Sequence, residues 1–373
     1  MRRLLLLALL VSSIAWAQTV PQPPSIAARA WLLLDYGSNL DLAGFNADLR
    51  VEPASLTKLM TAYLAFAALK QGRIQAKQIV PVSERAWKAP GSRMFIEPRQ
   101  SVTVDELLRG MIVQSGNDAC IALAEIIAGS EEAFAQMMNG EAQRLGLINT
   151  HFSNATGLPD AQHYSTANDL GRLALALIRD FPEYYTLYSL KEFRYNGITQ
   201  PNRNRLLWLD ASVDGVKTGH TEAAGFCLIA SAKRGPRRLL TVVIGADSDS
   251  TRAQESQKLL NFGFQYYDAV KLYDARQHIA ELRVFKGAAN AVGAGFENDL
   301  LVSVPRGRSA ELKVQLIPLQ RLVAPLPAGS RVATLKLSLG EKPYGEFAVV
   351  SLDPVAAAGV LGRAWDSLLL MFN

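Results

Sequence analysis

The sequence predicts an α/β (α+β) domain, in which helices flank an antiparallel sheet, followed by a small all-β sandwich domain and a C-terminal amphipathic helix. Two observations predict this order. Apolar residues recur at helical spacing in several segments before Val213, and alternating or β-branched runs dominate after it. In addition, 373 residues with 49% hydrophobic composition are enough for two globular domains.

Local patterns place the elements of the first domain. Ala30 to Asp35 is an apolar run that predicts a strand, and three- or four-residue periodicity or capping patterns predict helices. The predicted helices span residues 55–72, 103–113, 118–128 and 166–179. Turn residues then separate strands from Val213 onward, and a helix over 251–267 closes this domain against the sheet.

The chain changes character beyond residue 272. Short alternating runs separated by Gly, Pro and Asp are typical of a β-sandwich. The predicted strands are 300–304, 311–317, 331–339 and 347–352. We therefore expect a first domain over 18–272, a β-rich domain over 273–353 and a terminal helix over 354–373.

The N-terminal residues are typical of a secretory signal peptide. Arg2 and Arg3 precede an apolar run over 4–11, and Ala15-Trp16-Ala17 provides a small-residue cleavage pattern. The run is too short for a transmembrane helix. We therefore predict that residues 1–17 are removed and that the protein is exported.

Composition and charge exclude several classes of protein. The formal net charge is +5, and no basic run interleaved with aromatic residues suggests nucleic acid. Two cysteines, Cys120 and Cys227, are too few for a disulfide framework, although they could form one bridge. We expect both to be small buried residues instead. The four histidines form no metal-ligand pattern with them, so we expect neither a metal nor another cofactor.

Ser55 and Lys58 are candidates for a nucleophile and its base. Their spacing at the start of a predicted helix puts both side chains on one face. A serine hydroxyl attacks only when a base takes its proton, and a lysine amine serves as that base when burial or nearby positive charge lowers its pKa. By itself, Ser-x-x-Lys is a match that chance produces in a chain of this composition.

Two further motifs follow in order. Ser115-Gly116-Asn117 lies on a turn between predicted helices, and Lys217-Thr218-Gly219 ends a predicted strand. Alone, the first is a helix-capping turn and the second an ordinary strand end. Together with Ser55 and Lys58, they supply a proton relay, a cation for a substrate carboxylate and a glycine that permits close backbone approach. The ordered set predicts acyl transfer through a serine ester.

With these motifs the chain resembles the low-molecular-mass penicillin-binding proteins, the serine-type D-alanyl-D-alanine carboxypeptidases. The stretches Asp214–Thr221, Ser115–Ala119 and Asn202–Asn204 carry the resemblance, which covers almost everything after the signal peptide. It implies a first domain with the fold of serine β-lactamases and transpeptidases. It also implies removal of the terminal D-alanine from peptidoglycan stem peptides ending in D-Ala-D-Ala, without a cofactor, and acylation by penicillins and other β-lactams.

The resemblance also implies roles for individual residues. Ser55 would attack the peptide carbonyl, Lys58 would take its proton and later activate water, and backbone N–H groups of Ser55 and His220 would form the oxyanion hole. Ser115 would pass a proton to the departing D-alanine, and Asn117 would hold Lys58 and the substrate amide.

The terminal carboxylate of the substrate would be bound by Lys217 and Thr218, beside Gly219, with Arg203 as a further candidate. From the sequence, Arg203 is equally a solvated loop residue. His220 would contribute through its backbone, so its imidazole need not be catalytic.

Three alternatives share this site. A D,D-endopeptidase would use the same residues on cross-linked stem peptides. A β-lactamase requires rapid deacylation, usually through a glutamate before the Lys-Thr-Gly strand, and the region 151–169 offers only Asp160 and Asp169. A non-catalytic wall-binding scaffold would keep the fold, although all the named catalytic side chains are present.

The C-terminal residues 355–372 form a predicted amphipathic helix, with Trp365 and Phe372 among the apolar residues on one face. The segment is short for a membrane span and fits a membrane surface better. We therefore predict a peripheral protein on the periplasmic face of the inner membrane. The alternative is a helix docked on the β-rich domain or on a partner, because one Arg against one Asp leaves it without a basic face.

Overall fold

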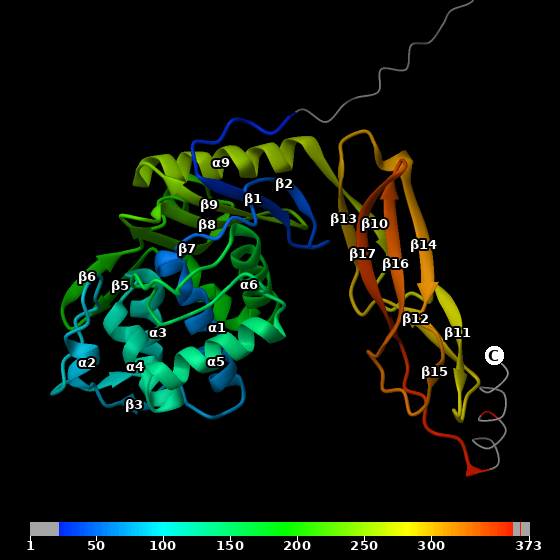
Figure 1. Cartoon of the computed structure of the whole chain (residues 1–373), viewed down its shortest axis with the longest axis horizontal. Helices are drawn as coiled ribbons and strands as arrows, with labels where there is room; N and C mark the ends of the chain where they lie inside the picture. The colour runs from blue at the N-terminus through cyan, green and yellow to red at the C-terminus, as the bar shows by residue number, and fades with distance from the viewer. Residues whose placement is uncertain (1–21, 361–365, 367–373) are drawn as a thin grey trace, which may run out of the picture.

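The structure is a computed structural model that describes residues 22–360 and residue 366. It contains a helix-flanked sheet and, beside it, an elongated part made of strands (Figure 1). This arrangement confirms the predicted α+β domain followed by an all-β domain. The predicted signal peptide, residues 1–17, lies outside the described residues.

A five-stranded antiparallel sheet forms the centre of the first part, with the strand order β2-β1-β9-β8-β7. The strands are β1 Ala30–Asp35, β2 Asp41–Phe45, β7 Val213–Thr221, β8 Gly225–Arg234 and β9 Arg237–Ala246. Most side chains on β1, β8 and β9 are buried whichever way they point, because helices cover both faces of the sheet. Continuous apolar runs are the sequence signature of such strands.

One face of the sheet is covered by α9, Asp249–Tyr266, which runs along it (Figure 1). Leu33 of β1, Leu239 of β9 and Leu259 of α9 belong to one buried apolar cluster between the two layers. The helix predicted over 251–267 is confirmed and packs against the sheet as expected.

Helices also cover the other face. The helices of the first part, besides α9, are α1 Lys58–Lys70, α2 Glu84–Trp87, α3 Val104–Val113, α4 Asn117–Ala128, α5 Glu131–Arg144, α6 Ala167–Asp180, α7 Pro182–Tyr185 and α8 Leu206–Leu209. Helix α6 packs on β1 and β9, and α1 packs on α4 and α6 with nearly all its side chains buried. Thr103 and Glu106 form the predicted capping box at the start of α3.

Short elements connect these helices. Two 3₁₀ turns, η1 Ala54–Thr57 and η2 Thr186–Ser189, precede α1 and follow α7. A small hairpin pairs β5 Glu192–Tyr195 with β6 Ile198–Pro201, and β3 Ile79–Val80 pairs antiparallel with β4 Val102–Thr103, which follows α2 in the chain. Of these, η1 matters most for function, because it carries one of the candidate catalytic residues.

The second part consists of two sheets that share one apolar core. Six strands follow the order β14-β16-β17-β12-β11-β15, and β10 pairs with β13. The strands are β10 Tyr267–Tyr273, β11 Ala280–Phe285, β12 Ala291–Gly295, β13 Leu300–Pro305, β14 Leu312–Pro318, β15 Leu322–Val323, β16 Arg331–Leu339 and β17 Lys342–Ser351. The sequence predicted β13, β14, β16 and β17.

The sequence did not predict β12, because its glycines resemble turn residues. A Cβ atom on Gly293 would lie 2.3 Å from the His278 ring, and one on Gly295 would lie 2.3 Å from the Gln277 carbonyl oxygen. The glycines therefore let the preceding segment lie close against the strand.

The structure differs from the predicted domain boundaries at two points. Strand β10 begins at Tyr267 and pairs with β13, so the β-rich part begins before residue 273. The terminal helix does not begin at residue 354, because Val355 forms an antiparallel β-bridge with Leu326.

Most of the predicted terminal helix lies outside the described residues. Asp366 is helical, and its carboxylate accepts a hydrogen bond from the backbone N–H of Lys286 in the β-rich part. Among the helices that the structure describes, none is both long and apolar enough to cross a membrane.

Candidate active site

Ser55 lies on the turn η1, just before α1, and not within the α-helix that the sequence predicts. The turn begins at Ala54, whose φ of +47° is a left-handed value that residues with a side chain seldom adopt. The other residues of the turn are buried, whereas Ser55 is partly exposed. A constrained backbone therefore presents this hydroxyl to a pocket.

Lys58 is the first residue of α1, and it is only 1% exposed. Its Nζ lies 2.8 Å from Ser55 Oγ and donates a hydrogen bond of 2.6 Å to the carbonyl oxygen of Thr156. Burial lowers the pKa of Lys58 to about 8, and the positive charge of Arg203 acts in the same direction. At this pKa roughly a tenth of the amine is in the neutral form that a general base requires at pH 7.

Ser115 lies between α3 and α4 with a φ of +64°, a second left-handed residue that has a side chain. The Nζ of Lys217 donates to Ser115 Oγ at 2.9 Å and to the Thr218 carbonyl oxygen at 3.0 Å. Burial lowers the pKa of Lys217 well below its ordinary value, and the charge of Lys58 adds to this effect. Lys217 therefore forms a buried pair with Ser115, beyond the role in carboxylate binding that its motif predicts.

Asn117 opens α4 behind these residues. Its Nδ2 donates to the Pro90 carbonyl oxygen at 2.7 Å, which ties the helix to the loop that carries Gly91. Among the described residues, its buried Oδ1 has no hydrogen-bond partner. The predicted contact between Asn117 and Lys58 is therefore not made, and Oδ1 is left as an acceptor for a donor that enters the site.

Asp118 fixes one wall of the site, and sequence reasoning missed it. Its fully buried carboxylate accepts hydrogen bonds from the backbone N–H groups of Met94, Phe95 and Ile96, at 2.8 to 3.3 Å. These bonds hold the segment next to Ser92, which lines the pocket. The available signal was an acidic residue in the first turn of a mostly apolar helix, because a buried carboxylate requires partners.

The Lys217-Thr218-Gly219 motif lies on β7, an edge strand of the sheet that packs against η1. A Cβ atom on Gly219 would lie 3.2 Å from both the backbone nitrogen of Ser55 and the Cβ of Ala54. Such contacts are tighter than ordinary packing, so glycine lets the strand run directly beside the turn. This is the close approach that the motif predicts.

The loop of residues 154–158 holds η1 from another direction. Gly157 has a φ of +82°, and a Cβ atom there would lie 1.8 Å from the Ala54 carbonyl oxygen. Both the conformation and the available space therefore require glycine. The turn that carries Ser55 is in contact with Gly157 on one side and Gly219 on another.

A pocket of about 410 Å³ opens onto these residues. It is lined by Ser55, Gly91, Ser92, Ser115, Arg203, Thr218, Gly219, His220, Phe226 and Arg252. The structure thus brings together residues from all three predicted motifs. Lys58 and Lys217 are buried next to the pocket and reach it through their contacts with the two serines.

Two arginines line the pocket. Arg203 faces the pocket, as binding of a substrate carboxylate requires. Asn204 fixes its loop by donating to the Gly215 carbonyl oxygen at 3.0 Å. Arg252, which sequence reasoning missed, comes from α9 and donates to the Gly219 carbonyl oxygen at 3.0 Å. The sequence carried no signal for it, because an arginine in a helix is usually solvated.

The end of β7 is fixed by contacts around His220. The His220 ring packs on Phe226 with 4.0 Å between ring centroids. Next to it, Thr221 Oγ1 donates to the Glu52 carboxylate at 3.2 Å and accepts from the Ala224 N–H at 3.0 Å. The imidazole thus has a packing role, and these contacts hold the backbone of His220 in place.

His163 supports η1 from within the core. Its Nε2 lies 2.8 Å from Thr57 Oγ1, and its Nδ1 accepts from the Ser153 N–H at 3.2 Å. Because Nδ1 is an acceptor, the neutral ring carries its proton on Nε2 and donates to Thr57. Burial lowers the pKa of His163 to about 4. Sequence reasoning considered His163 only as a possible metal ligand and therefore missed this role.

The two aspartates considered for a β-lactamase reaction are engaged elsewhere. Asp160 accepts hydrogen bonds from Ser153 Oγ and the Gln162 N–H, both at 2.8 Å. Asp169 accepts from Thr150 Oγ1 at 2.7 Å. Neither lines the pocket, so neither is placed to activate water at Ser55.

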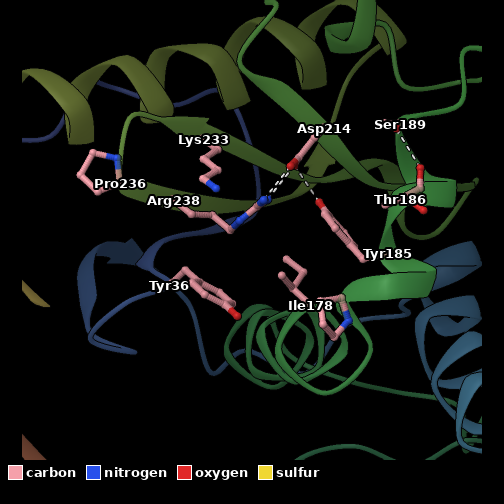
Figure 2. Close-up of a pocket in the computed structure, with 10 residues that line it drawn as sticks. Tyr36, Ile178, Tyr185, Thr186, Ser189, Asp214, Lys233, Pro236 and Arg238 are labelled. Carbon is pink, nitrogen blue, oxygen red and sulfur yellow. Dashed lines mark hydrogen bonds and ion pairs between the residues drawn. The ribbon is translucent and has the colours of Figure 1, made fainter. Parts of the chain in front are cut away.

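A second pocket, also of about 410 Å³, lies at the other end of β7 (Figure 2). There Arg238 forms an ion pair of 2.7 Å with Asp214, and the Tyr185 hydroxyl donates to the same carboxylate at 2.9 Å. Asp214 belongs to the stretch that carries the family resemblance. Its role is to fix the start of the strand, since it does not line the candidate active site.

Cys120 and Cys227 are both buried and free, so the expectation of two small buried residues is confirmed. Burial raises the pKa of the Cys120 thiol to about 12 and that of Cys227 to about 11. Both are therefore neutral thiols at physiological pH.

The comparisons with known proteins agree with this geometry. Residues 17–248 match the family model described as D-alanyl-D-alanine carboxypeptidase. The chain therefore belongs to the D-alanyl-D-alanine carboxypeptidase family, a family of serine-type hydrolases. Residues 267–357 match the model of the C-terminal domain of penicillin-binding protein 5, so within the family the chain has the two-part organisation of that protein.

Individual relatives cover nearly the whole chain. It is 42% identical to D-alanyl-D-alanine carboxypeptidase DacC of Escherichia coli over 97% of this chain and 92% of that protein. The crystal structure of penicillin-binding protein 5 from Haemophilus influenzae matches with a TM-score of 0.79 at 40% identity, over 90% of this chain and 99% of that one. Penicillin-binding protein D2 from Listeria monocytogenes, in its ampicillin-bound form, matches with a TM-score of 0.61 at 30% identity, over 65% of this chain and 100% of that one.

The buried imidazole of His163 should make the protein less stable in acid. Its pKa is near 4 in the folded state against 6.5 for the ordinary side chain, so the folded state resists protonation that the unfolded state accepts. The stability that this difference contributes is present above pH 6.5 and is lost as the pH falls towards 4. The loss amounts to about 3 kcal/mol.

The measurement is urea unfolding at several pH values for the parent protein and a His163→Asn variant. The variant should show a smaller decrease in unfolding free energy across this window, and His151→Asn, which changes a more exposed imidazole, should behave like the parent. Parallel pH dependences for the parent and His163→Asn would contradict the assignment.

Proposed function

We propose that the protein removes the terminal D-alanine from peptidoglycan stem peptides through an acyl-enzyme on Ser55. The observation that carries this proposal is the pair of buried amines: the Nζ atoms of Lys58 and Lys217 lie 2.8 and 2.9 Å from the hydroxyls of Ser55 and Ser115. Each amine is thereby paired with a hydroxyl at one pocket. The D-alanyl-D-alanine carboxypeptidase family supplies the reaction class.

Acylation begins with proton transfer from Ser55 to Lys58. The Ser55 oxygen then attacks the carbonyl carbon between the two D-alanines, and the resulting oxyanion is stabilised by the backbone N–H groups of Ser55 and His220. Gly219 supports this arrangement, because it lets β7 lie beside the Ser55 backbone at a distance where a side chain would make tighter contacts than ordinary packing.

Collapse of the tetrahedral intermediate requires a proton for the departing amine. The proton that Lys58 took from Ser55 passes to the amine through the Ser115 hydroxyl, so Lys58 is neutral again; Lys217 holds this hydroxyl in place by its hydrogen bond of 2.9 Å. Free D-alanine leaves, and the remaining peptide stays attached to Ser55 as an ester. Lys58 then takes a proton from water, the resulting hydroxide attacks the ester, and Ser55 recovers its proton.

The substrate carboxylate would lie at the positively charged side of the pocket. Thr218 offers a hydroxyl, and Arg203 and Arg252 offer guanidinium groups that suit a carboxylate. A penicillin also carries a carboxylate beside a reactive amide, so the same site would acylate Ser55 with the drug. The ampicillin-bound form of the Listeria relative is consistent with this step.

The test is to incubate the protein with a soluble peptide ending in D-Ala-D-Ala, with cross-linked stem peptides and with benzylpenicillin. We expect release of free D-alanine from the linear peptide and a persistent penicilloyl adduct on Ser55 by mass spectrometry. A Ser55→Ala variant should lose both, because no nucleophile remains.

Each alternative has its own signature in this experiment. Cleavage of the cross-linked peptides without release of D-alanine would indicate an endopeptidase. Hydrolysed penicillin without an adduct would indicate a β-lactamase, and intact penicillin with no adduct would indicate a scaffold. Any of these three results would contradict the proposed carboxypeptidase.

We further propose that the protein is exported and bound to the periplasmic face of the membrane through its C-terminal helix. The basic and apolar N-terminal pattern and the apolar face of residues 360–373 support this proposal. The hydrogen bond between the backbone N–H of Lys286 and the Asp366 carboxylate favours docking of the helix on the β-rich part instead.

Cell fractionation separates these two proposals for the C-terminal helix. The mature protein should sediment with membranes and be released when residues 360–373 are deleted, while its peptidase activity on a soluble peptide is unchanged. A full-length protein that stays in the soluble fraction would contradict membrane binding.

A further inference from the structure

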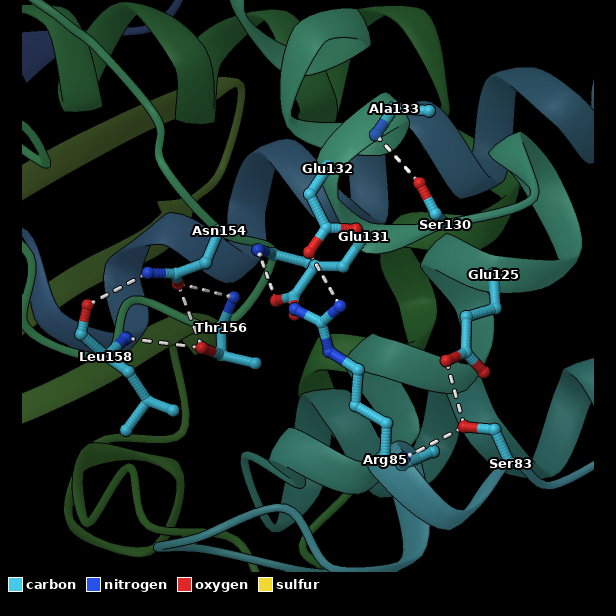
Figure 3. A network of polar contacts seen from close by, with 12 residues as sticks. Ser83, Arg85, Glu125, Ser130, Glu131, Glu132, Ala133, Asn154, Thr156 and Leu158 are labelled. Carbon is cyan, nitrogen blue, oxygen red and sulfur yellow. Dashed lines mark hydrogen bonds and ion pairs between the residues drawn. The ribbon is translucent and has the colours of Figure 1, made fainter.

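A buried carboxylate behind the active site has no part in the steps above. Glu131, the first residue of α5, is 6% exposed, and its Oε2 pairs with Arg85 of α2 at 2.6 Å (Figure 3). Its Oε1 accepts a hydrogen bond of 3.0 Å from the backbone N–H of Ala155. Both oxygens are engaged, so this glutamate links α2 and α5 to the loop of residues 154–158.

That loop holds the candidate general base. The side-chain oxygen of Asn154 accepts from the Thr156 and Gly157 N–H groups at 3.1 and 2.7 Å, which makes the loop a compact unit. The Thr156 carbonyl oxygen in turn accepts from Lys58 Nζ at 2.6 Å. The peptide unit that Glu131 anchors, between residues 154 and 155, is therefore separated by one peptide unit from the one that positions the amine.

The orientation of the Lys58 amine matters for proton transfer. A neutral amine has two N–H donors and one lone pair, so an N–H directed at the Thr156 oxygen restricts where the lone pair points. The geometry leaves Ser55 Oγ within 2.8 Å of the same nitrogen, in a position to donate its proton. Displacement of Thr156 would remove this restriction.

The charge of Glu131 acts on the same amine. Burial is the main influence on the pKa of Lys58 and lowers it, whereas the negative charge of Glu131 opposes that effect. The glutamate thus affects both the orientation and the ionisation of Lys58. Two separable effects make the role testable.

We propose that Glu131 is a positioning residue for the acylation of Ser55, acting through the backbone of Ala155 and Thr156 on Lys58. This inference rests on the proposed roles of Ser55 and Lys58. It assigns no contact with substrate to Glu131, which lies behind the loop and does not line the pocket.

The chain offers a matched control in the next residue. Glu132 pairs with the other terminal nitrogen of Arg85, also at 2.6 Å, but its side chain is 67% exposed. Substitution of Glu132 removes a similar ion pair at the same helix terminus. It leaves the hydrogen bond to Ala155 intact.

The experiment measures the second-order rate constant for acylation by benzylpenicillin, between about pH 6 and about pH 10. The proteins are the full chain and its Glu131→Ala, Glu131→Gln, Glu132→Ala and Glu132→Gln variants, each checked by circular dichroism. Glu131→Ala removes both the acceptor and the charge. Glu131→Gln keeps an oxygen for the Ala155 N–H but removes the charge.

We expect Glu131→Ala to lower the plateau rate constant by about tenfold or more, because the base is no longer oriented. Glu131→Gln should retain the plateau within about threefold, with its midpoint moved to lower pH, because a charge that favours the ammonium form is lost. Both Glu132 variants should remain within about twofold of the parent at every pH.

Two results would overturn the inference. One is that both Glu131→Ala and Glu131→Gln fold and that their acylation rate constants show the same pH dependence as those of the parent. The other is an equal decrease in both variants, with unmoved midpoints and an equal loss of thermal stability, which would indicate a purely structural role. If Glu131→Ala does not fold, the pH midpoint of Glu131→Gln is compared with that of Glu132→Gln. A lower midpoint in Glu131→Gln alone supports the inference, and equal midpoints overturn it. An unacylated parent protein would instead contradict the proposed function.

Discussion

The site depends on the burial of two lysine amines beside two serine hydroxyls. A buried ammonium loses its hydration, and a second positive charge nearby is a further cost, so both effects favour neutral amines at Lys58 and Lys217. Each Nζ still has a backbone carbonyl acceptor, on Thr156 and Thr218, which compensates part of the lost solvation. The burial that makes these side chains unfavourable for stability is what makes them bases.

The surrounding fold keeps this arrangement in place. The nucleophile is on a turn that begins at a left-handed alanine, Ala54, and Ser115 is itself left-handed. Such residues cost of order 1–3 kcal/mol each and persist only where neighbouring structure determines them. Here Gly157 brings a loop against the turn, closer than any side chain would allow, and Gly219 brings an edge strand to a distance at which a side chain would be tightly packed. Rigid packing around η1 thus fixes the geometry on which proton transfer depends.

Sequence patterns predicted the motifs and the elements that bear them, because caps, periodicity and local spacing are encoded within short segments. Helix α5 was missed because its sequence is polar overall and lacks a clear apolar face. At the site, the roles of Asp118, Glu131 and Arg252 were missed because each acts on backbone groups far away in the chain: the loop after Ser92, the Ala155 N–H and the Gly219 carbonyl oxygen. The expected hydrogen bond between Asn117 and Lys58 is not formed. The reason is related, because a motif specifies residue types but not which hydrogen-bond partner each residue takes.

The ionisation of Lys58 tests this account most directly. In protein with isotopically labelled lysine side chains, the Lys58 signal can be identified by its absence from a Lys58→Arg variant and followed through a pH titration by nuclear magnetic resonance. The account predicts a midpoint near pH 8, well below the ordinary lysine value of 10.5. A midpoint at the ordinary value would leave fewer than about one amine in a thousand neutral at pH 7, against about one in ten at a midpoint near 8, and it would contradict the role of Lys58 as the base that activates Ser55.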